Sequence, residues 1–231
     1  MADHMGEAYL RYSFTKGTVQ EINHIVSALS LEPGMRVLDV GCGPGRHAYE
    51  LAQRGIHCHG IDISQTFVDI ANSQAPSGAT FERMDARALL FDDEFDAVVC
   101  LCQGAFGLMT ANGHDRDVLN GISRALKMGG RVALSAFNAY FAVKYHTEAQ
   151  FDADSGVSHE TTDIRNQSGE VKTVDLWTGC YTPRELRLLM EDADLSVDSI
   201  SSVEPGAYGY APPTVESPEF LLIASKTPFR R

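Results

Sequence analysis

Hydrophobic residues in the first part of the chain follow two spacings in turn. Residues 18–29 place their apolar side chains on one face of a helix, and residues 46–54 do the same. Between them, residues 36–40 form a short β-branched run that ends at a cluster of glycines. The pattern predicts a helix, a strand, a glycine turn and a second helix, in that order.

The alternation of strand and helix patterns continues along the chain. Further strands are predicted at residues 56–61, 80–83, 95–101 and 131–137, and further helices at residues 65–73 and 115–127. Strands that alternate with helices pair in parallel, and the helices then cover both faces of the sheet. The sequence therefore predicts an α/β fold with a mostly parallel sheet.

A different pattern begins at residue 138. Two polar, β-prone stretches at residues 158–165 and 171–178 flank a loop at 166–169, whose Asn-Gln-Ser-Gly sequence is typical of a hairpin. Because these stretches follow the fifth strand, we expect an antiparallel flap inserted at that point.

The remaining elements complete a single predicted domain. A capping box at residues 182–185 opens a helix, and two strands follow it at residues 195–203 and 220–225. The domain divides into an N-terminal helical cap, a core, an inserted flap, and a C-terminal helix with the last two strands. These parts are residues 1–34, 35–137, 138–180 and 181–231, respectively.

The charge balance, the length of the apolar stretches and the cysteines argue against a nucleic-acid-binding, membrane or secreted protein. Lysine and arginine total 19 against 31 acidic residues, so the formal charge of -12 would repel the phosphates of a nucleic acid. No apolar stretch approaches the roughly 20 residues that cross a bilayer, and the first residues lack a secretion signal. Five cysteines without a Cys-x-x-Cys pair predict reduced thiols. We expect a cytoplasmic protein that binds neither nucleic acid nor a membrane.

Glycines and acidic residues follow the first three predicted strands. Gly41, Gly43 and Gly45 come directly after the first strand, where ligands bind in open α/β sheets and where glycine lets the backbone approach a ligand. Asp62 follows the second strand, where a carboxylate accepts hydrogen bonds from both hydroxyls of a ribose. Asp85 follows the third strand and is placed to accept from the exocyclic amine of adenine. Together these residues predict a site for one adenosine.

Two kinds of cofactor contain such an adenosine. Dinucleotide sites use Gly-x-Gly-x-x-Gly, whose last glycine lets the helix pack closely beneath a pyrophosphate. Here the glycines are spaced Gly-x-Gly-x-Gly, and Arg46 follows them. The spacing disfavours NAD and leaves an NAD-dependent oxidoreductase as the rival interpretation.

Five stretches of the sequence resemble the successive motifs of the Rossmann-like (class I) S-adenosylmethionine-dependent methyltransferases. These stretches are VLDVGCGPGRHAYELAQRG, GIDIS, MDAR, FDAVVCLCQGAFG and ALKMGGRVALSAF, and they span about residues 36 to 137. The resemblance implies a doubly wound, mostly parallel sheet of seven strands whose last strand is antiparallel. It also implies S-adenosylmethionine as the cofactor and S-adenosylhomocysteine as the product.

The resemblance further implies which residues face each part of the cofactor. The glycine turn and the residues just after it face the methionine portion, the acids after the second and third strands face the ribose and the adenine, and the segment after the fourth strand faces the sulfonium. The predicted cofactor-binding residues are Gly41, Cys42, Gly43, Arg46, Asp62, Ile63, Asp85, Ala86, Leu101 and Gln103. His47 is a neighbour of the methionine portion or a residue of the helix surface.

The expected acceptor of the methyl group is a small organic molecule, methylated at oxygen or nitrogen. Residues 101–104 lack the Asn-Pro-Pro-Tyr type of sequence that the family's nucleic-acid and protein amide enzymes carry there. They also lack the acidic ligands of the metal-dependent catechol enzymes, so we expect no metal. The transfer is an in-line displacement that depends chiefly on alignment, and it needs a general base only where the nucleophile starts protonated.

Aromatic and histidine side chains outside the core are the candidates for the acceptor site. The predicted substrate pocket comprises Tyr12, Tyr140, Tyr145, Trp177 and Tyr208. His146 and His159 flank the inserted flap and are the candidate general bases, because histidine can titrate near neutral pH.

A monomer or homodimer is expected. A non-catalytic module that binds S-adenosylmethionine and regulates a partner is the second alternative.

Overall fold

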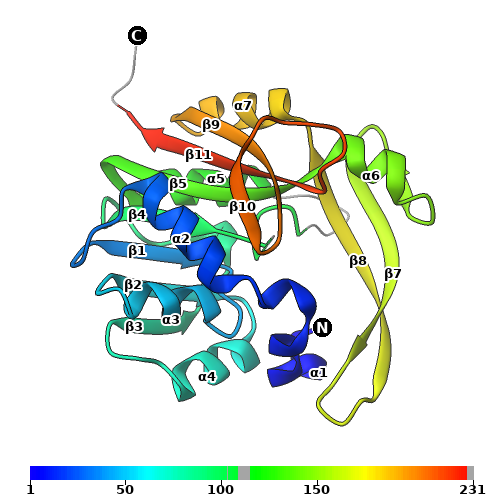
Figure 1. The fold of residues 1–231 in the computed structure, drawn as a ribbon, viewed down its shortest axis with the longest axis horizontal. Coiled ribbons are helices and arrows are strands. Elements are labelled where there is room, and N and C mark those ends of the chain that lie inside the picture. The colour runs from blue at the N-terminus through cyan, green and yellow to red at the C-terminus, as the bar shows by residue number, and fades with distance from the viewer. Residues whose placement is uncertain (103, 109–114, 228–231) are drawn as a thin grey trace.

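The computed structural model describes residues 1–102, 104–108 and 115–227, and its centre is a twisted β-sheet (Figure 1). In this part of the chain, hydrogen-bonded neighbours follow the order β10-β9-β11-β5-β4-β1-β2-β3. The bounds of these strands are β1 (Arg36–Val40), β2 (His57–Asp62), β3 (Ala79–Arg83), β4 (Phe95–Cys100), β5 (Leu126–Asn138), β9 (Leu195–Glu204), β10 (Ala207–Ala211) and β11 (Glu219–Lys226). Strands β1 to β5 pair in parallel, whereas β11 runs antiparallel between β5 and β9.

Helices cover both faces of this sheet, because successive strand residues point to opposite faces. Leu38 packs in one hydrophobic cluster with α5 (Asp115–Ala125) and α7 (Pro183–Asp192). Val37 packs in the other cluster, which includes the apolar faces of α2 (Thr18–Leu29), α3 (Arg46–Ala52) and α4 (Gln65–Ser73). The predicted doubly wound, mostly parallel α/β sheet is confirmed, with β10 as an added edge strand.

The inserted flap is a long antiparallel hairpin that leaves the sheet after β5 (Figure 1). Its elements are α6 (Ala139–Tyr145), β6 (Gln150–Asp152), β7 (Val157–Arg165) and β8 (Val171–Tyr181). The base of β8 pairs in parallel with the end of β5, at Cys180 and Phe137. Near the tip, Ile164 of β7 packs against Met5 and Phe67, so the flap reaches across to the N-terminal segment and α4.

Three parts of the structure differ from the predicted elements. The helix predicted to end at residue 127 ends at Ala125, and β5 begins at Leu126, because Leu126 pairs with Phe95 of β4. β10 lies between the last two predicted strands, where the sequence pattern predicted no strand, and it pairs with β9. The N-terminal segment forms a short helix and two 3₁₀ turns that the sequence pattern did not predict: α1 (Ala2–Met5), η1 (Gly6–Arg11) and η2 (Ser13–Thr15).

Among the described helices, none has the length and apolar character to cross a membrane.

Candidate functional site

The glycine turn joins the end of β1 to the start of α3. Gly41, Gly43 and Gly45 have φ angles of 74°, 54° and 86°, which lie in the left-handed region that favours glycine. A Cβ added to Gly41 would lie 2.2 Å from the carbonyl carbon of Gly104. The turn therefore depends on glycine both for its backbone angles and for its close contact with the segment after β4.

Asp62 organises the same turn from the end of β2. Its Oδ2 accepts a hydrogen bond from the backbone N–H of Gly43 at 2.9 Å, and its Oδ1 accepts one from the N–H of Ser64 at 2.8 Å. Burial raises the pKa of Asp62, whereas the two backbone donors favour the ionised form. The acid predicted to bind ribose thus also fixes the backbone around the site.

A cavity of about 190 Å³ opens at the carboxyl ends of β1, β2 and β3. Its lining is Gly41, Ile61, Asp62, Ile63, Met84, Asp85, Ala86, Arg87, Gly104, Ala105, Gly107, Leu108, Asp115 and Val118. Five predicted cofactor residues, one from the glycine turn and two each from the ends of β2 and β3, are among them. Asp85 also forms an ion pair with Arg87 at 2.5 Å, so a ligand amine would meet a carboxylate that already has a partner.

The other predicted cofactor residues lie around this cavity or outside the described chain. Cys42 is buried in the hydrophobic cluster below the turn, and burial raises the pKa of its thiol. Leu101 is also buried in that cluster, with 3% of its surface exposed. Arg46 is held in a polar network beside the turn. Gln103 lies outside the described residues.

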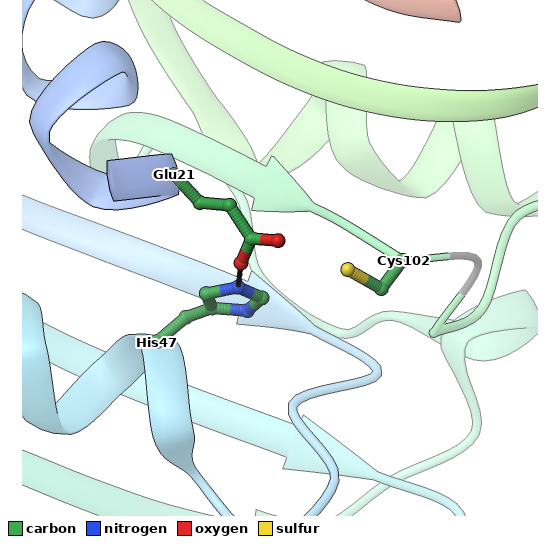
Figure 2. Close-up of side chains that lie close together, drawn as sticks. All are labelled: Glu21, His47 and Cys102. Carbon is green, nitrogen blue, oxygen red and sulfur yellow. Dashed lines mark hydrogen bonds and ion pairs between the residues drawn. The ribbon is translucent and has the colours of Figure 1, made fainter. Parts of the chain in front are cut away.

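That polar network centres on Glu21 of α2, which is completely buried. Its Oε2 accepts from Arg46 at 2.6 Å and lies 2.8 Å from Nε2 of His47, while its Oε1 accepts from the N–H of Gly206 at 2.8 Å. Arg46 also donates to the Sγ of Cys102 at 2.8 Å. Figure 2 shows Glu21, His47 and Cys102 turned toward one another from three separate elements. His47 is therefore buried in this network and does not lie on the helix surface.

Glu21, His47 and Cys102 could together hold a metal ion, because one donor atom from each lies within 4.8 Å of the others. The guanidinium of Arg46, however, contacts both the carboxylate of Glu21 and the Sγ of Cys102. Burial also raises the pKa of the Cys102 thiol to about 12, although the charge of Arg46 opposes this effect. Since the fixed positive charge of Arg46 already contacts two of the three donor atoms, these residues do not fit a resident cation.

Two tyrosines lie beside the glycine turn and the polar network. The ring of Tyr9 lies 3.8 Å from the position of a Cβ on Gly43, and burial raises the pKa of its hydroxyl. Tyr208 of β10 is buried, and its hydroxyl lies 3.9 Å from the Sγ of Cys102. Glu21 does not belong to the predicted site, because its partners are far away in sequence and no local pattern marks it.

The flap carries most of the residues that were predicted to bind or deprotonate the methyl acceptor, and it places them at separate positions. Ser158 and Ile164 are buried, so the residues at alternate positions of β7, including His159, lie on the opposite face of the hairpin. His159 stacks on Trp177 with ring centroids 3.8 Å apart and bonds to Asp175 at 2.9 Å. Neither His159 nor Trp177 is among the described residues that line the cofactor cavity.

His146 has a different position, at the end of α6. It lines a small cavity of about 50 Å³ together with Asn138, Glu160, Thr178 and other residues of the flap base. Thr178 forms an isolated bridge with Leu108, and Leu108 also lines the cofactor cavity. Of the two candidate bases, His146 thus lines a cavity whose residue Thr178 is bridged to a residue of the cofactor cavity.

The three predicted pocket tyrosines outside β10 also lie apart. Tyr140 and Tyr145 are half exposed on α6, and the hydroxyl of Tyr145 bonds to Glu216. Tyr12 accepts a hydrogen bond from the backbone N–H of Arg165 at the flap tip, at 3.1 Å. Of the five residues predicted for the substrate pocket, Tyr208 lies beside Cys102 and the other four lie on the N-terminal segment, α6 and the flap.

Comparison with known proteins identifies a matching family and several relatives of this chain. Residues 37–130 match the family described as "Methyltransferase domain". The chain is 30% identical over 137 residues to "Putative methyltransferase YqeM" of Bacillus subtilis (strain 168), a match that covers 56% of this chain and 54% of the relative. It is 34% identical over 124 residues to "Ubiquinone biosynthesis O-methyltransferase" of Dechloromonas aromatica (strain RCB), covering 51% of this chain and 50% of the relative.

The sequence matches cover about half of the chain, whereas the similarity to solved structures extends over nearly all of it. The CcbJ methyltransferase from Streptomyces caelestis superposes with a TM-score of 0.81 over 98% of both chains, at 15% sequence identity. Identity this low supports the fold alone. The sequence matches span about half the length of the curated relatives, and they confirm the resemblance that the motifs indicated.

Proposed function

The chain carries a methyltransferase domain of the Rossmann-like (class I), S-adenosylmethionine-dependent family, and from this premise we propose that it methylates an oxygen or nitrogen atom of a small organic molecule. The observation that carries the proposal is the cavity at the ends of β1, β2 and β3, where Gly41, Asp62 and Asp85 converge. Relatives and structural neighbours include ubiquinone O-methyltransferases and an amino pentose methyltransferase, which act on small molecules by their names. The names of the ubiquinone O-methyltransferases and of the glycopeptide N-methyltransferase MtfA indicate that this fold is compatible with both oxygen and nitrogen acceptors.

The side chain of Arg46 supports S-adenosylmethionine over a dinucleotide. Counting from Gly41 and Gly43, Arg46 occupies the position of the third glycine in Gly-x-Gly-x-x-Gly. Its guanidinium is nearly buried and paired with Glu21, so a large side chain fills the space that a dinucleotide fold keeps free beneath its pyrophosphate.

The mechanism that fits these residues is alignment. With the adenosine held by Asp62 and its neighbours, the methionine portion would extend over the glycine turn toward Leu101 and Cys102, which follow β4. The flap is tied to the same region, because Gly179 donates to the carbonyl of Gly107 at 2.8 Å and Gly107 lines the cavity. This attachment allows the flap base to orient an acceptor in line with the methyl group.

Binding and turnover together test the proposal. In calorimetry, S-adenosylhomocysteine should bind the purified chain, and NADH should not. Labelled S-adenosylmethionine should then transfer its methyl group to members of a panel of phenols, hydroxy acids and primary amines. Binding of NADH in preference to S-adenosylhomocysteine would favour the oxidoreductase, and binding without transfer to any acceptor would favour the regulatory module.

The substitution Asp62→Ala should weaken S-adenosylhomocysteine binding by about 1 to 3 kcal/mol, because the ligand loses a charged acceptor and two backbone N–H groups lose their partner. Calorimetry measures this change directly. Asp62→Asn keeps one acceptor oxygen and should lose less affinity. An Asp62→Ala protein with the affinity of the unchanged chain would refute the assignment of this residue to the ribose.

The general base, if the acceptor is a hydroxyl, is proposed to be His146. The substitution His146→Gln should lower kcat by about a hundredfold or more, since a positioned general base contributes about 10²- to 10⁴-fold and alignment supplies the rest of the rate. Steady-state kinetics measure kcat, and His159→Gln is measured beside it. Equal kcat values for the unchanged chain and both variants would dismiss a histidine base.

A further inference from the structure

The buried carboxylate of Glu21 joins four parts of the chain that meet at the cofactor site. It accepts hydrogen bonds from the start of α3 through Arg46 and His47, and from the turn between β9 and β10 through Gly206. Through Arg46 it also reaches Cys102, the second residue after β4. Glu21 itself belongs to α2, so one side chain fixes this helix to the start of α3 and to two loops, the β9–β10 turn and the segment after β4.

The charge of Glu21 is needed at this position. The side chains of Glu21 and Arg46 are 0% and 8% exposed, so each is the main compensation for the buried charge of the other. Burial alone would raise the pKa of Glu21, but the bonds from His47 and Arg46 lower it to about 2. Burial lowers the pKa of His47, so the ring contributes a hydrogen bond rather than a charge.

We infer that Glu21 is a positioning residue of the cofactor site, which holds the Arg46 guanidinium against Cys102 and thereby fixes the start of α3 relative to the segment after β4 (Figure 2). The inference rests on the proposed function in one respect, namely that these two elements flank the methionine portion of S-adenosylmethionine. Cys102 has a φ angle of 51°, a left-handed conformation that a cysteine adopts only when its surroundings hold it there. The contact with Arg46 is one such restraint.

Glu21→Gln tests the inference, with Glu50→Gln as the matched control. Glu50 of α3 also pairs with an arginine, Arg54, at 2.8 Å, but this pair is part-exposed and, within the described part of the chain, shares no hydrogen bond with Glu21, His47 or Cys102. Glu21→Gln should raise the Kd for S-adenosylhomocysteine and the KM for S-adenosylmethionine by about tenfold with a smaller change in kcat, and Glu50→Gln should change neither. Glu21→Asp keeps the charge and should recover part of the affinity.

The reactivity of Cys102 gives a second readout that does not require any enzymatic activity. Removing the negative charge of Glu21 leaves the positive charge of Arg46 beside the thiol, so the thiol should ionise more readily. Alkylation of Cys102 by iodoacetamide at pH 8, followed by peptide mass spectrometry, should be about fivefold faster in Glu21→Gln. The fully buried Cys58 and Cys100 are internal references, because unfolding would expose all three.

The outcomes separate this inference from the proposed function. If the unchanged chain binds no S-adenosylhomocysteine, the proposed function fails, while the rate of Cys102 alkylation still tests the network. An unchanged alkylation rate in a folded Glu21→Gln protein, or unchanged affinity in a chain that does bind, overturns the inference. Loss of binding after dialysis against EDTA, restored by zinc, would assign Glu21, His47 and Cys102 to a metal and overturn it as well. If Glu21→Gln does not fold, Glu21→Asp carries the affinity measurement: its shorter side chain should still raise the Kd for S-adenosylhomocysteine, and an unchanged Kd overturns the inference.

Discussion

Gly41→Ala should abolish measurable binding of S-adenosylhomocysteine and lower the free energy of unfolding by about 3 to 5 kcal/mol. Two costs add at this position. Alanine is strained at a φ of 74°, and its Cβ would lie 2.2 Å from the carbonyl carbon and 2.3 Å from the carbonyl oxygen of Gly104. Since both atoms belong to the backbone, the segment after β4 must move away from the glycine turn. Calorimetry and urea denaturation measure the two effects.

Gly34→Ala separates the clash from the backbone strain. Gly34 has a φ of 90°, comparable with that of Gly41, but a Cβ added there would meet no atom within 4 Å. We expect Gly34→Ala to cost only about 1 to 2 kcal/mol of stability and to leave the affinity for S-adenosylhomocysteine intact. If both variants lost the same stability and both kept their affinity, the contact between Gly41 and Gly104 would have no part in the site.

The sequence predicted the core elements closely because local signals and tertiary structure agree there. The bounds of α2, β1 and α4 match the predicted ranges, since a helical apolar face or a β-branched run coincides with clear end signals. At α4 the side chain of Ser64 accepts from the N–H of Phe67, and at α7 Thr182 and Glu185 form the predicted capping box. Such caps can be recognised in the sequence because both partners are within three residues.

The elements that were missed depend on distant partners. Leu126 continues the apolar spacing of α5, but pairing with Phe95 makes it the first residue of β5. β10 has glycine and tyrosine composition typical of a loop, and it becomes a strand because β9 offers a free edge beside α2. A pattern read along the chain contains neither partner, so these elements could not be predicted from it.

The candidate site shows the same division. The positions of Gly41, Asp62 and Asp85 follow from one rule, that the ends of parallel strands meet at one edge of the sheet. The role of Glu21 does not, because its partners Arg46 and Gly206 lie 25 and 185 residues away. The flap was predicted as a hairpin, but which of its faces turns inward depends on contacts such as that of Ile164 with Phe67.

A buried acid below the glycine turn carries the second large prediction. Asp39 of β1 is 1% exposed, and its Oδ2 has no hydrogen-bond partner among the described residues. Burial raises the pKa of Asp39 to about 7; the charge of Arg46 and the N–H of Ala48 oppose the rise, and the charge of Asp62 adds to it. The folded chain therefore binds a proton at Asp39 that the unfolded chain releases near pH 4.

This difference makes stability fall as the pH rises from about 4 to about 7, because ionising Asp39 costs more in the folded state than in the unfolded state. Asp39→Asn replaces the acid with a neutral side chain of the same shape, so it should unfold with a free energy about 2 to 4 kcal/mol higher at pH 8 and nearly unchanged at pH 4. Urea denaturation of both proteins at the two pH values measures the difference. A constant difference across this range would mean that Asp39 does not titrate between them, and that a positive charge near the turn keeps it ionised throughout.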